Sequence, residues 1–166
     1  MLAALLAEQQ PGSSYPFRWP LPLPVERFLV REDEQAAGVA EVDGAVVGHV
    51  AAGSAPGTGE PDATFRTATG CTDPALVSVL FTGTRVRDTG VGGRLLDTAV
   101  AWARAHGRAP VLDVVQRHGN ALAVYRHRGW TEIGRFRCDW LPEDEPDVVL
   151  MTLPEHRTQP SARRGS

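Results

Sequence analysis

Apolar residues recur along this chain at two spacings, and the change from one spacing to the other predicts a domain of mixed helices and strands. Leucine, alanine and valine at helical spacing indicate helices, whereas short apolar or alternating runs bounded by glycine and proline indicate strands. We expect helices at Leu2 to Gln9, Val25 to Val30, Arg94 to His106 and Ala121 to His127. We expect strands at Ala37 to Val42, Ala45 to Ala51, Leu76 to Thr82, Val111 to Val115, Thr131 to Cys138 and Val148 to Leu153.

Glycine and proline mark the connections between these elements. Asp43-Gly44, between two strand-like runs, predicts a tight β-hairpin, because both residues tolerate the positive φ angles of a two-residue turn. Pro11-Gly12 is expected to end the first helix, and the proline-rich, aromatic stretch from Tyr15 to Trp19 indicates an extended loop. The segment Gly53 to Thr72 is rich in Gly, Pro, Thr and Ala and predicts a long mobile loop.

The order of the elements predicts an α/β protein of the α+β type, with a mixed sheet and helices packed on its faces. The strands at Leu76 to Thr82 and Val111 to Val115 are joined by a helix, which predicts that they run parallel. In this chain of 166 residues, we expect a single domain that spans residues 1–153. We expect the polar tail at residues 154–166 to be disordered.

Composition and charge argue against several kinds of partner. The hydrophobic fraction of 42% and the charged fraction of 22% are typical of a soluble globular protein. A net charge of -3, with no basic cluster apart from Arg163-Arg164, argues against nucleic acid. The apolar start from Met1 to Ala7 is too short for a membrane span, so we expect a cytoplasmic protein without a membrane partner. Cys71 and Cys138 have no CxxC spacing and are expected to be free thiols, with no metal site.

The segment with the most chemical content is Arg87-Asp88-Thr89-Gly90-Val91-Gly92-Gly93, between a strand-like run and a helix-like run. Its glycines allow backbone N–H groups to converge, and the following helix adds unpaired N–H donors and the positive end of its dipole. The segment therefore predicts a phosphate or pyrophosphate site. Two other phosphate motifs do not fit. Leu95 stands where a dinucleotide fingerprint needs its third glycine, and Arg94 stands where a P-loop needs lysine.

Three linked pieces of the chain resemble the GNAT family of acyl-CoA-dependent N-acetyltransferases. They are the strand at Leu76 to Thr82 with Arg87-x-x-Gly90-x-Gly92, the helix carrying Leu95-Leu96, and Ala121-x-x-x-Tyr125-x-x-x-Gly129-Trp130. The resemblance covers Ala36 to Leu153 and implies a mostly antiparallel sheet in which the two central parallel strands splay apart. It also implies that acetyl-CoA lays its pantetheine arm along the strand and its pyrophosphate on the backbone amides of the glycine-rich segment. The cofactor-binding residues implied in this way are Leu80, Phe81, Thr82, Arg87, Asp88, Thr89, Gly90, Val91, Gly92, Gly93, His118 and Ala121.

The resemblance also implies a catalytic tyrosine. Acetyl transfer to an amine needs a neutral amine and a proton for the departing thiolate, and a phenol with a pKa of about 10 can supply that proton. Tyr125 matches the family's tyrosine, four residues before the Gly-aromatic pair, and is expected to be the general acid rather than a packing residue alone.

The general base is less well defined by the sequence. The candidates are His49, Glu41 and Asp73, and a chain of water molecules leading to bulk solvent is an equal alternative. Asp113, within an apolar strand, ranks behind Tyr125 because its carboxylate could serve local hydrogen bonds alone.

Three features depart from the family's pattern. Counting back seven residues from Tyr125 reaches His118, where the family usually has an asparagine that contacts the cofactor; we expect His118 to replace it, with Asn120 as the alternative. Asp88 adds a negative charge to the pyrophosphate segment, which Arg87 and Arg94 would help to offset. The chain starts inside its first helix, without the strand that commonly precedes it in the family. We therefore expect an exposed sheet edge and a homodimer that covers it.

The sequence thus predicts an acetyl-CoA-dependent N-acetyltransferase that moves an acetyl group to a primary amine of a small molecule or peptide by direct attack in a ternary complex. Two alternatives stay open. One is a catalytically silent module of the same fold that binds CoA or a partner, and the other is an unrelated binder of phosphate esters. No motif identifies the acceptor, because specificity in such a fold comes from the first helices and the loops.

Overall fold

A computed structural model describes residues 1–117 and 120–155, and its centre is a six-stranded sheet with the strand order β1-β2-β3-β4-β6-β5. The strands are β1 (Glu34–Val42), β2 (Ala45–Ser54), β3 (Ala75–Thr82), β4 (Pro110–Val114), β5 (Thr131–Phe136) and β6 (Val148–Thr152). The helices are α1 (Leu2–Ser13), α2 (Val25–Leu29), α3 (Gly59–Thr69), α4 (Val91–Ala105) and α5 (Ala121–His127), with a short 3-10 helix, η1, at Thr84–Val86.

The sheet combines antiparallel strands with one parallel pair at its centre. The predicted hairpin joins β1 to β2 through Asp43 and Gly44, whose φ angles are 51° and 76°. β3 and β4 run parallel, as predicted, because α4 returns the chain to the same end of the sheet. The other neighbouring strands of the described ranges run antiparallel. The predicted fold class is therefore confirmed.

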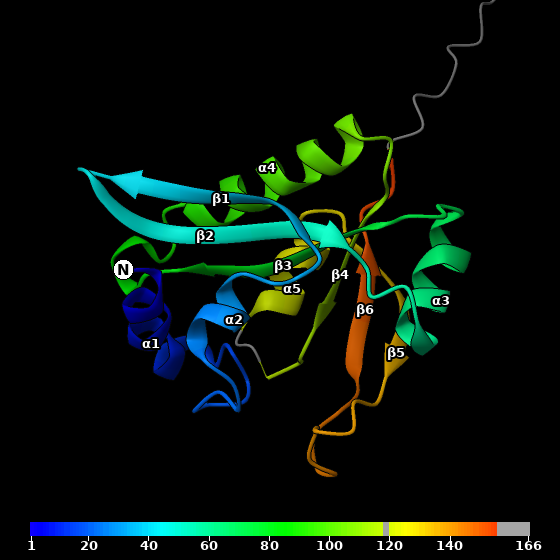
Figure 1. Cartoon of the computed structure of the whole chain (residues 1–166), viewed down its shortest axis with the longest axis horizontal. Helices are drawn as coiled ribbons and strands as arrows, with labels where there is room; N and C mark the ends of the chain where they lie inside the picture. The colour runs from blue at the N-terminus through cyan, green and yellow to red at the C-terminus, as the bar shows by residue number, and fades with distance from the viewer. Residues whose placement is uncertain (118–119, 156–166) are drawn as a thin grey trace, which may run out of the picture.

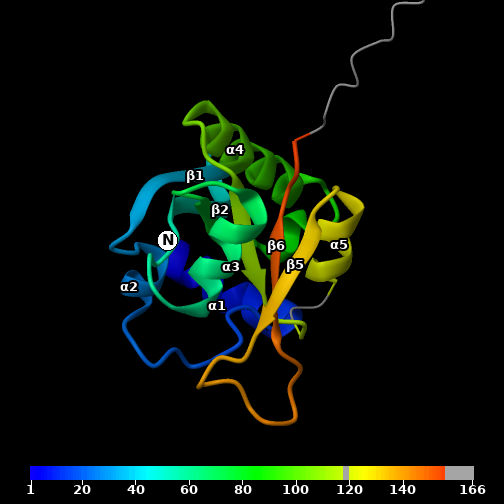
Figure 2. The same cartoon turned by 90° about the vertical axis from the view of Figure 1, so that its right-hand side faces the viewer.

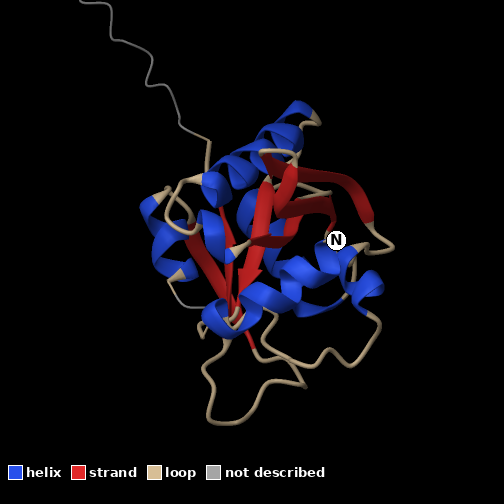
Figure 3. Ribbon diagram, turned by 90° about the vertical axis from the view of Figure 1, so that its left-hand side faces the viewer, coloured by secondary structure: helices blue, strands red, loops and turns tan. Residues whose placement is uncertain are grey.

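Helices cover both faces of the sheet, as Figures 1 and 2 show. α4 packs against β1, β2 and β3, where Leu95 and Leu96 share a core with Val50. α1 packs on the other face of β2 and β3, where Leu6 is fully buried beside Val79. α3 packs against β5 and β6. In Figure 3 the strands lie between these helices, so the parallel pair at the centre of the sheet is enclosed from both sides.

The prediction of a long mobile loop at Gly53 to Thr72 is wrong, because α3 occupies Gly59–Thr69. The helix has its own start and stop signals: acidic residues in the first turn, and Gly70 in a left-handed conformation with a φ of 67° after the last turn. Phe65, 1% exposed, anchors the helix in a core with residues of β4 and β6. One large apolar residue does not produce a helical period, so periodicity alone does not reveal this helix.

Other element boundaries differ from the prediction by a few residues. α1 continues through Pro11 to Ser13, and Ser14 ends it in a left-handed conformation with a φ of 57°. β1 begins earlier than predicted, at Glu34, and β5 ends at Phe136.

Two further expectations concern the ends and composition of the chain. Within the described ranges, none of the helices has the length and apolar character needed to cross a bilayer. Cys71 and Cys138 are free thiols, as predicted. Residues 156–166 of the predicted tail lie outside the described residues.

Candidate active site

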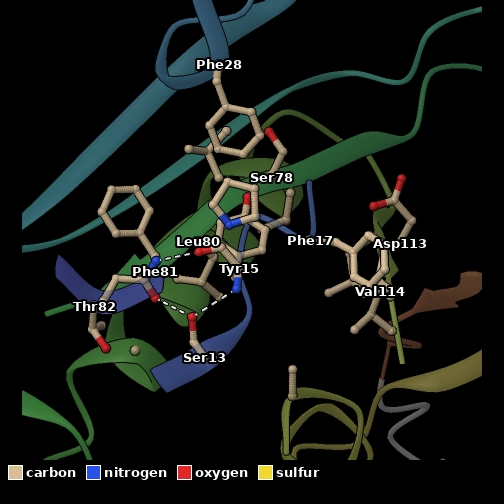
Figure 4. Close-up of a pocket in the computed structure, with 18 of the residues that line it drawn as sticks. Ser13, Tyr15, Phe17, Phe28, Ser78, Leu80, Phe81, Thr82, Asp113 and Val114 are labelled. Atoms are coloured by element: carbon tan, nitrogen blue, oxygen red, sulfur yellow. Dashed lines mark hydrogen bonds between the residues drawn. The ribbon is translucent and has the colours of Figure 1, made fainter. Parts of the chain in front are cut away.

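A cavity opens where the two parallel strands separate. β3 and β4 pair at their beginning, where Leu76 lies opposite Val111, and diverge further along. The cavity between them has a volume of about 490 Å³. In Figure 4, Leu80 lies on the β3 side of this space, and Asp113 and Val114 lie on the β4 side. The parallel pair is therefore splayed, and the slot between its strands is the candidate active site.

A β-bulge in β3 accompanies this separation. Val79 and Leu80 together lie opposite Val50 of β2, and Val79 has a φ of 51°. A positive φ costs a β-branched residue about 1–3 kcal/mol and persists only where the surroundings hold it. His49 provides such support, because its Nδ1 lies 2.8 Å from the Val79 carbonyl oxygen and its ring stacks on Phe81 at 5.7 Å. Such a bulge bends a strand and increases its twist, here at the point where β3 leaves β4.

The glycine-rich turn forms one end of the cavity. Gly90 is the N-cap residue of α4, with a φ of 85°, and Asp88 has a φ of 62°. α4 begins at Val91, earlier than predicted, so that Gly92 and Gly93 lie in its first turn. The N–H groups of a first turn have no partner within the helix, and the helix dipole adds positive potential at the same place. This end of the cavity is therefore suited to an anion.

Two arginines border the same end of the cavity, Arg87 and Arg128. The Arg128 Nη2 donates a hydrogen bond to the Gly93 carbonyl oxygen at 3.2 Å and lies 2.6 Å from Asp97 Oδ1. Gly93 makes this approach possible, since a Cβ at that position would come within 2.8 Å of Arg128 Nη1. Arg87 adds a positive charge to the partial charge of the helix end, and Arg128 adds one that Asp97 partly offsets.

Further along the cavity, Tyr125 of α5 contributes a phenol. Its ring meets Trp130 edge-on, with 6.0 Å between the centroids. Burial, and to a lesser extent the negative charge of Asp113, raise the pKa of Tyr125 to about 12. The phenol therefore stays protonated at neutral pH and can act as a proton donor.

Asp113 of β4 contributes a carboxylate to the same cavity. Its side chain is exposed to the cavity, and desolvation by the protein around it raises the pKa of Asp113. The positive charge of Arg31 works in the opposite direction and offsets part of the rise. A carboxylate whose pKa is raised binds a proton more tightly, so Asp113 is a better base than an ordinary aspartate.

Aromatic side chains from the segments before β1 and after β5 line the remaining part of the cavity. Tyr15 and Phe28 have ring centroids 5.9 Å apart, and Phe17 lies 6.1 Å from Trp140. These four side chains form an aromatic wall of the cavity. Gln9, which is 3% exposed, holds the backbone at Tyr15 in place, because its Nε2 donates a hydrogen bond to the Tyr15 carbonyl oxygen at 2.6 Å. Burial raises the pKa of the Tyr15 phenol, which is therefore neutral.

Most of the predicted site residues lie around this one cavity. Those that line it are Leu80, Phe81, Thr82, Arg87, Gly92, Gly93, Ala121 and Tyr125. Asp88, Thr89, Gly90 and Val91 form the adjoining turn and helix start. The side chain of Asp88 is exposed and does not line the cavity. His118 lies outside the described residues, and Asn120, the alternative contact, is the N-cap residue of α5.

Among the candidate bases, Asp113 borders the cavity, although sequence reasoning ranked it behind Tyr125. His49, 3% exposed, supports the bulge from outside the cavity. Glu41 lies on β1, and Asp73 forms an ion pair with Arg108 at 3.1 Å. Within the part of the chain that the structure describes, these three side chains do not line the cavity.

Sequence reasoning missed Arg31, Arg128 and the bulge at Val79. Arg128 follows Tyr125 closely, but its position beside α4 becomes apparent only from the way the two helices pack. Arg31 follows α2 without a motif, and Val79 stands in an apolar run that favours a regular strand. In residues 1–117 and 120–155, no group of three or more His, Cys, Asp or Glu side chains could hold a metal ion.

Several solved structures resemble this fold. The ribosomal-protein-S18-alanine N-acetyltransferase from Escherichia coli has a TM-score of 0.61 at 18% identity, covering 92% of this chain and 86% of that chain. Ard1 from Thermoplasma volcanium has a TM-score of 0.60 at 18% identity, covering 93% and 92%. A proposed streptothricin acetyltransferase from Bacillus anthracis, in complex with acetyl coenzyme A, has a TM-score of 0.57 at 15% identity, covering 81% and 69%. At these identities the likeness is one of fold.

Sequence comparison bears on the family. No curated protein sequence matches the chain significantly. The model of the acetyltransferase (GNAT) family matches residues 3–130, which include the bulge, the glycine-rich turn and Tyr125. The chain therefore belongs to the GNAT acetyltransferase family.

Proposed function

We propose that this protein is an acetyl-CoA-dependent N-acetyltransferase that acts on a primary amine of a small molecule or peptide, by direct attack within a ternary complex. The observation that carries the proposal is the continuity of one cavity, which is lined by the start of α4, Tyr125 and Asp113. An anion site, a proton donor and a proton acceptor along one slot are the groups that this reaction needs.

The anion end of the cavity fits the diphosphate of CoA. Arg87, Arg128 and the first-turn N–H groups of Gly92 and Gly93 would hold the phosphate oxygens. The exposed edge of β3 from Leu80 to Thr82, where β4 has moved away, would accept hydrogen bonds from the pantetheine arm and donate to it. The family match, and the acetyl coenzyme A complex of the Bacillus anthracis protein, support this choice of donor.

Acetyl-CoA supplies the acetyl group, and side chains of the cavity accept and donate the protons. An alkylamine with a pKa of about 10.4 arrives as an ammonium ion, so one proton must leave before nitrogen can attack. Asp113 accepts this proton, directly or through a water molecule in the cavity. The nitrogen then forms a bond to the carbonyl carbon while the carbon–sulfur bond breaks.

Tyr125 donates its phenol proton to the departing sulfur. The nitrogen still carries one proton more than the amide product, and this proton returns to Tyr125 through water, so the phenol is restored. With its pKa raised to about 12, Tyr125 is protonated at the start of every cycle. The products are the acetylated amine and CoA as a free thiol, and Asp113 releases its proton to solvent to complete the cycle.

Calorimetric titration with acetyl-CoA tests the donor half of this proposal. We expect saturable binding to the wild-type protein and about tenfold weaker binding to Arg128→Ala, which removes a charge-assisted contact to phosphate. Arg104→Ala, in the last turn of α4 and at the opposite end of the helix from the anion site, serves as the matched control. Absence of binding at millimolar acetyl-CoA, with the protein folded, would contradict the proposal.

A further inference from the structure

The charged residues that line the cavity are mainly arginines. Arg18, Arg31, Arg87 and Arg128 line it together with Asp113. Arg87 and Arg128 border the start of α4, where they match the CoA diphosphate. Arg18 and Arg31 belong to the segments before β1, among the aromatic side chains of the opposite wall. The part of the cavity beyond the donor site therefore carries positive charge of its own.

Arg31 is the better positioned of these two arginines to meet an acceptor. It is half-buried, and its guanidinium lies over the ring of Phe28, 5.5 Å from the centroid. Arg31, Asp113 and Tyr15 line the same cavity, and the positive charge of Arg31 acts to lower the pKa values of the other two groups. Among residues 1–117 and 120–155, its guanidinium forms no ion pair. Glu34 shares a small neighbouring pocket with Arg31 but lies beyond ion-pair distance and does not line the main cavity.

The wall around Arg31 is apolar. Tyr15, Phe17, Phe28 and Trp140 line this part of the cavity, and Leu21 lies beside them. Aromatic rings in a cavity bind apolar, and above all aromatic, groups of a ligand. A polyamine or another polycation would leave its additional charges beside apolar rings and Arg31, where no described carboxylate other than Asp113 lines the cavity.

We propose that the acceptor is an amino acid with an apolar or aromatic side chain, whose carboxylate binds Arg31 while its amine lies beside Asp113. The aromatic wall would receive the side chain. This inference rests on the proposed function, and it identifies the acceptor class of that same site. Arg31 would also offset the repulsion between Asp113 and the carboxylate of the acceptor.

Steady-state acetylation of three matched amines tests this assignment. Phenylalanine carries the carboxylate, phenylalaninamide replaces it with a neutral amide, and phenethylamine lacks it altogether. With saturating acetyl-CoA, we expect the wild-type kcat/KM for phenylalanine to exceed the other two by about tenfold or more, the effect of a charge-assisted hydrogen bond. Spermidine, as a polycation, is expected to be the poorest acceptor of the panel.

The variant Arg31→Ala should lose the preference for phenylalanine, while Arg31→Lys should retain part of it. Arg27→Ala removes an exposed charge of α2 outside the cavity and is the matched control. If the wild-type protein acetylates phenethylamine or spermidine as fast as phenylalanine, or faster, the acceptor assignment is wrong. The proposed N-acetyltransferase activity would still stand. Acetyl-CoA binding with no acetylation of phenylalanine would also overturn the acceptor assignment. Failure to bind acetyl-CoA would instead contradict the proposed function.

Discussion

Asp113 and Tyr125 show how one physical cause can prepare two residues for opposite tasks. Desolvation is the largest contribution to the raised pKa of each group. For the carboxylate, the rise makes a stronger base at neutral pH. For the phenol, it keeps the group protonated at neutral pH, so that a proton is available when negative charge develops on the sulfur. The negative charge of Asp113 adds to the rise at Tyr125, so the base also helps to keep the acid protonated.

The pH dependence of Asp113→Asn tests the role of this carboxylate. In the wild-type protein, kcat/KM should fall as the pH drops through the raised pKa of Asp113, because the base becomes protonated. The variant should lose about 100-fold in kcat/KM near neutral pH and recover as the pH approaches the acceptor amine's own pKa. Initial rates across a pH series measure both effects.

Asp144→Asn, the same change on an exposed loop residue, is the matched control and should leave the profile unchanged. Thermal unfolding adds a second readout. Because the folded-state pKa of Asp113 lies above its ordinary value, the folded protein binds the proton more tightly than the unfolded chain. Ionisation above that pKa therefore costs stability, and Asp113→Asn should be at least as stable as wild type at neutral pH. An unaltered pH profile in Asp113→Asn would refute its role as base.

At this scale, sequence reasoning locates a residue of the cavity where that residue stands at a fixed spacing in a motif. Tyr125 is predicted in this way, from its distance to the Gly-aromatic pair. Asp113 ranks low in the sequence because an aspartate in an apolar strand has no motif, and its importance follows from the divergence of two strands. The strain at Val79 depends on the pairing with β2 and on His49, which no local pattern contains.

Among the elements, α4 is predicted from its apolar period, although it begins at Val91 and not at Arg94. Glycine spacing predicts an anion site there, and the structure adds that the helix starts within the motif, so that Gly92 and Gly93 contribute first-turn N–H groups. α3 is the counterexample. Its capping signals are present, but with Phe65 as its only large apolar residue it shows no periodicity that would identify a helix.

Two glycines at the ends of α4 provide a matched pair of variants. Gly90 and Gly107 both have positive φ angles, 85° and 66°, and a Cβ at either position would meet no other atom within 4 Å. A valine is strained at either place by about 1–3 kcal/mol, so both variants should lose stability by similar amounts. Only Gly90→Val is expected to weaken acetyl-CoA binding, by about tenfold, because it distorts the start of the helix.

Thermal unfolding and calorimetric titration on the same samples separate the two effects. Gly107→Val, just after the end of α4, controls for backbone strain in general. Equal affinity for acetyl-CoA in the two variants, at equal stability, would show that the start of α4 is not the phosphate site.

At the scale of the whole molecule, the order of helices and strands predicts a mixed sheet with one parallel pair, and the structure confirms it. The family resemblance implies that β3 and β4 splay apart, but the volume and lining of the slot depend on where pairing stops and on the segments before β1, which no local pattern gives. β1 is an edge strand of the described sheet, with Val39 50% exposed, and a homodimer that covers this edge stays a prediction.

The central claim is that the slot between β3 and β4 transfers an acetyl group to an amine, with Tyr125 as the acid. Amine-dependent release of the CoA thiol by the wild-type protein and by Tyr125→Phe, with acetyl-CoA affinity measured on both, tests it most directly. We predict release by wild type only when an amine is present, and in Tyr125→Phe a kcat about 100-fold lower at unchanged acetyl-CoA affinity. An unchanged kcat, or equal losses of kcat and acetyl-CoA affinity, would contradict the claim.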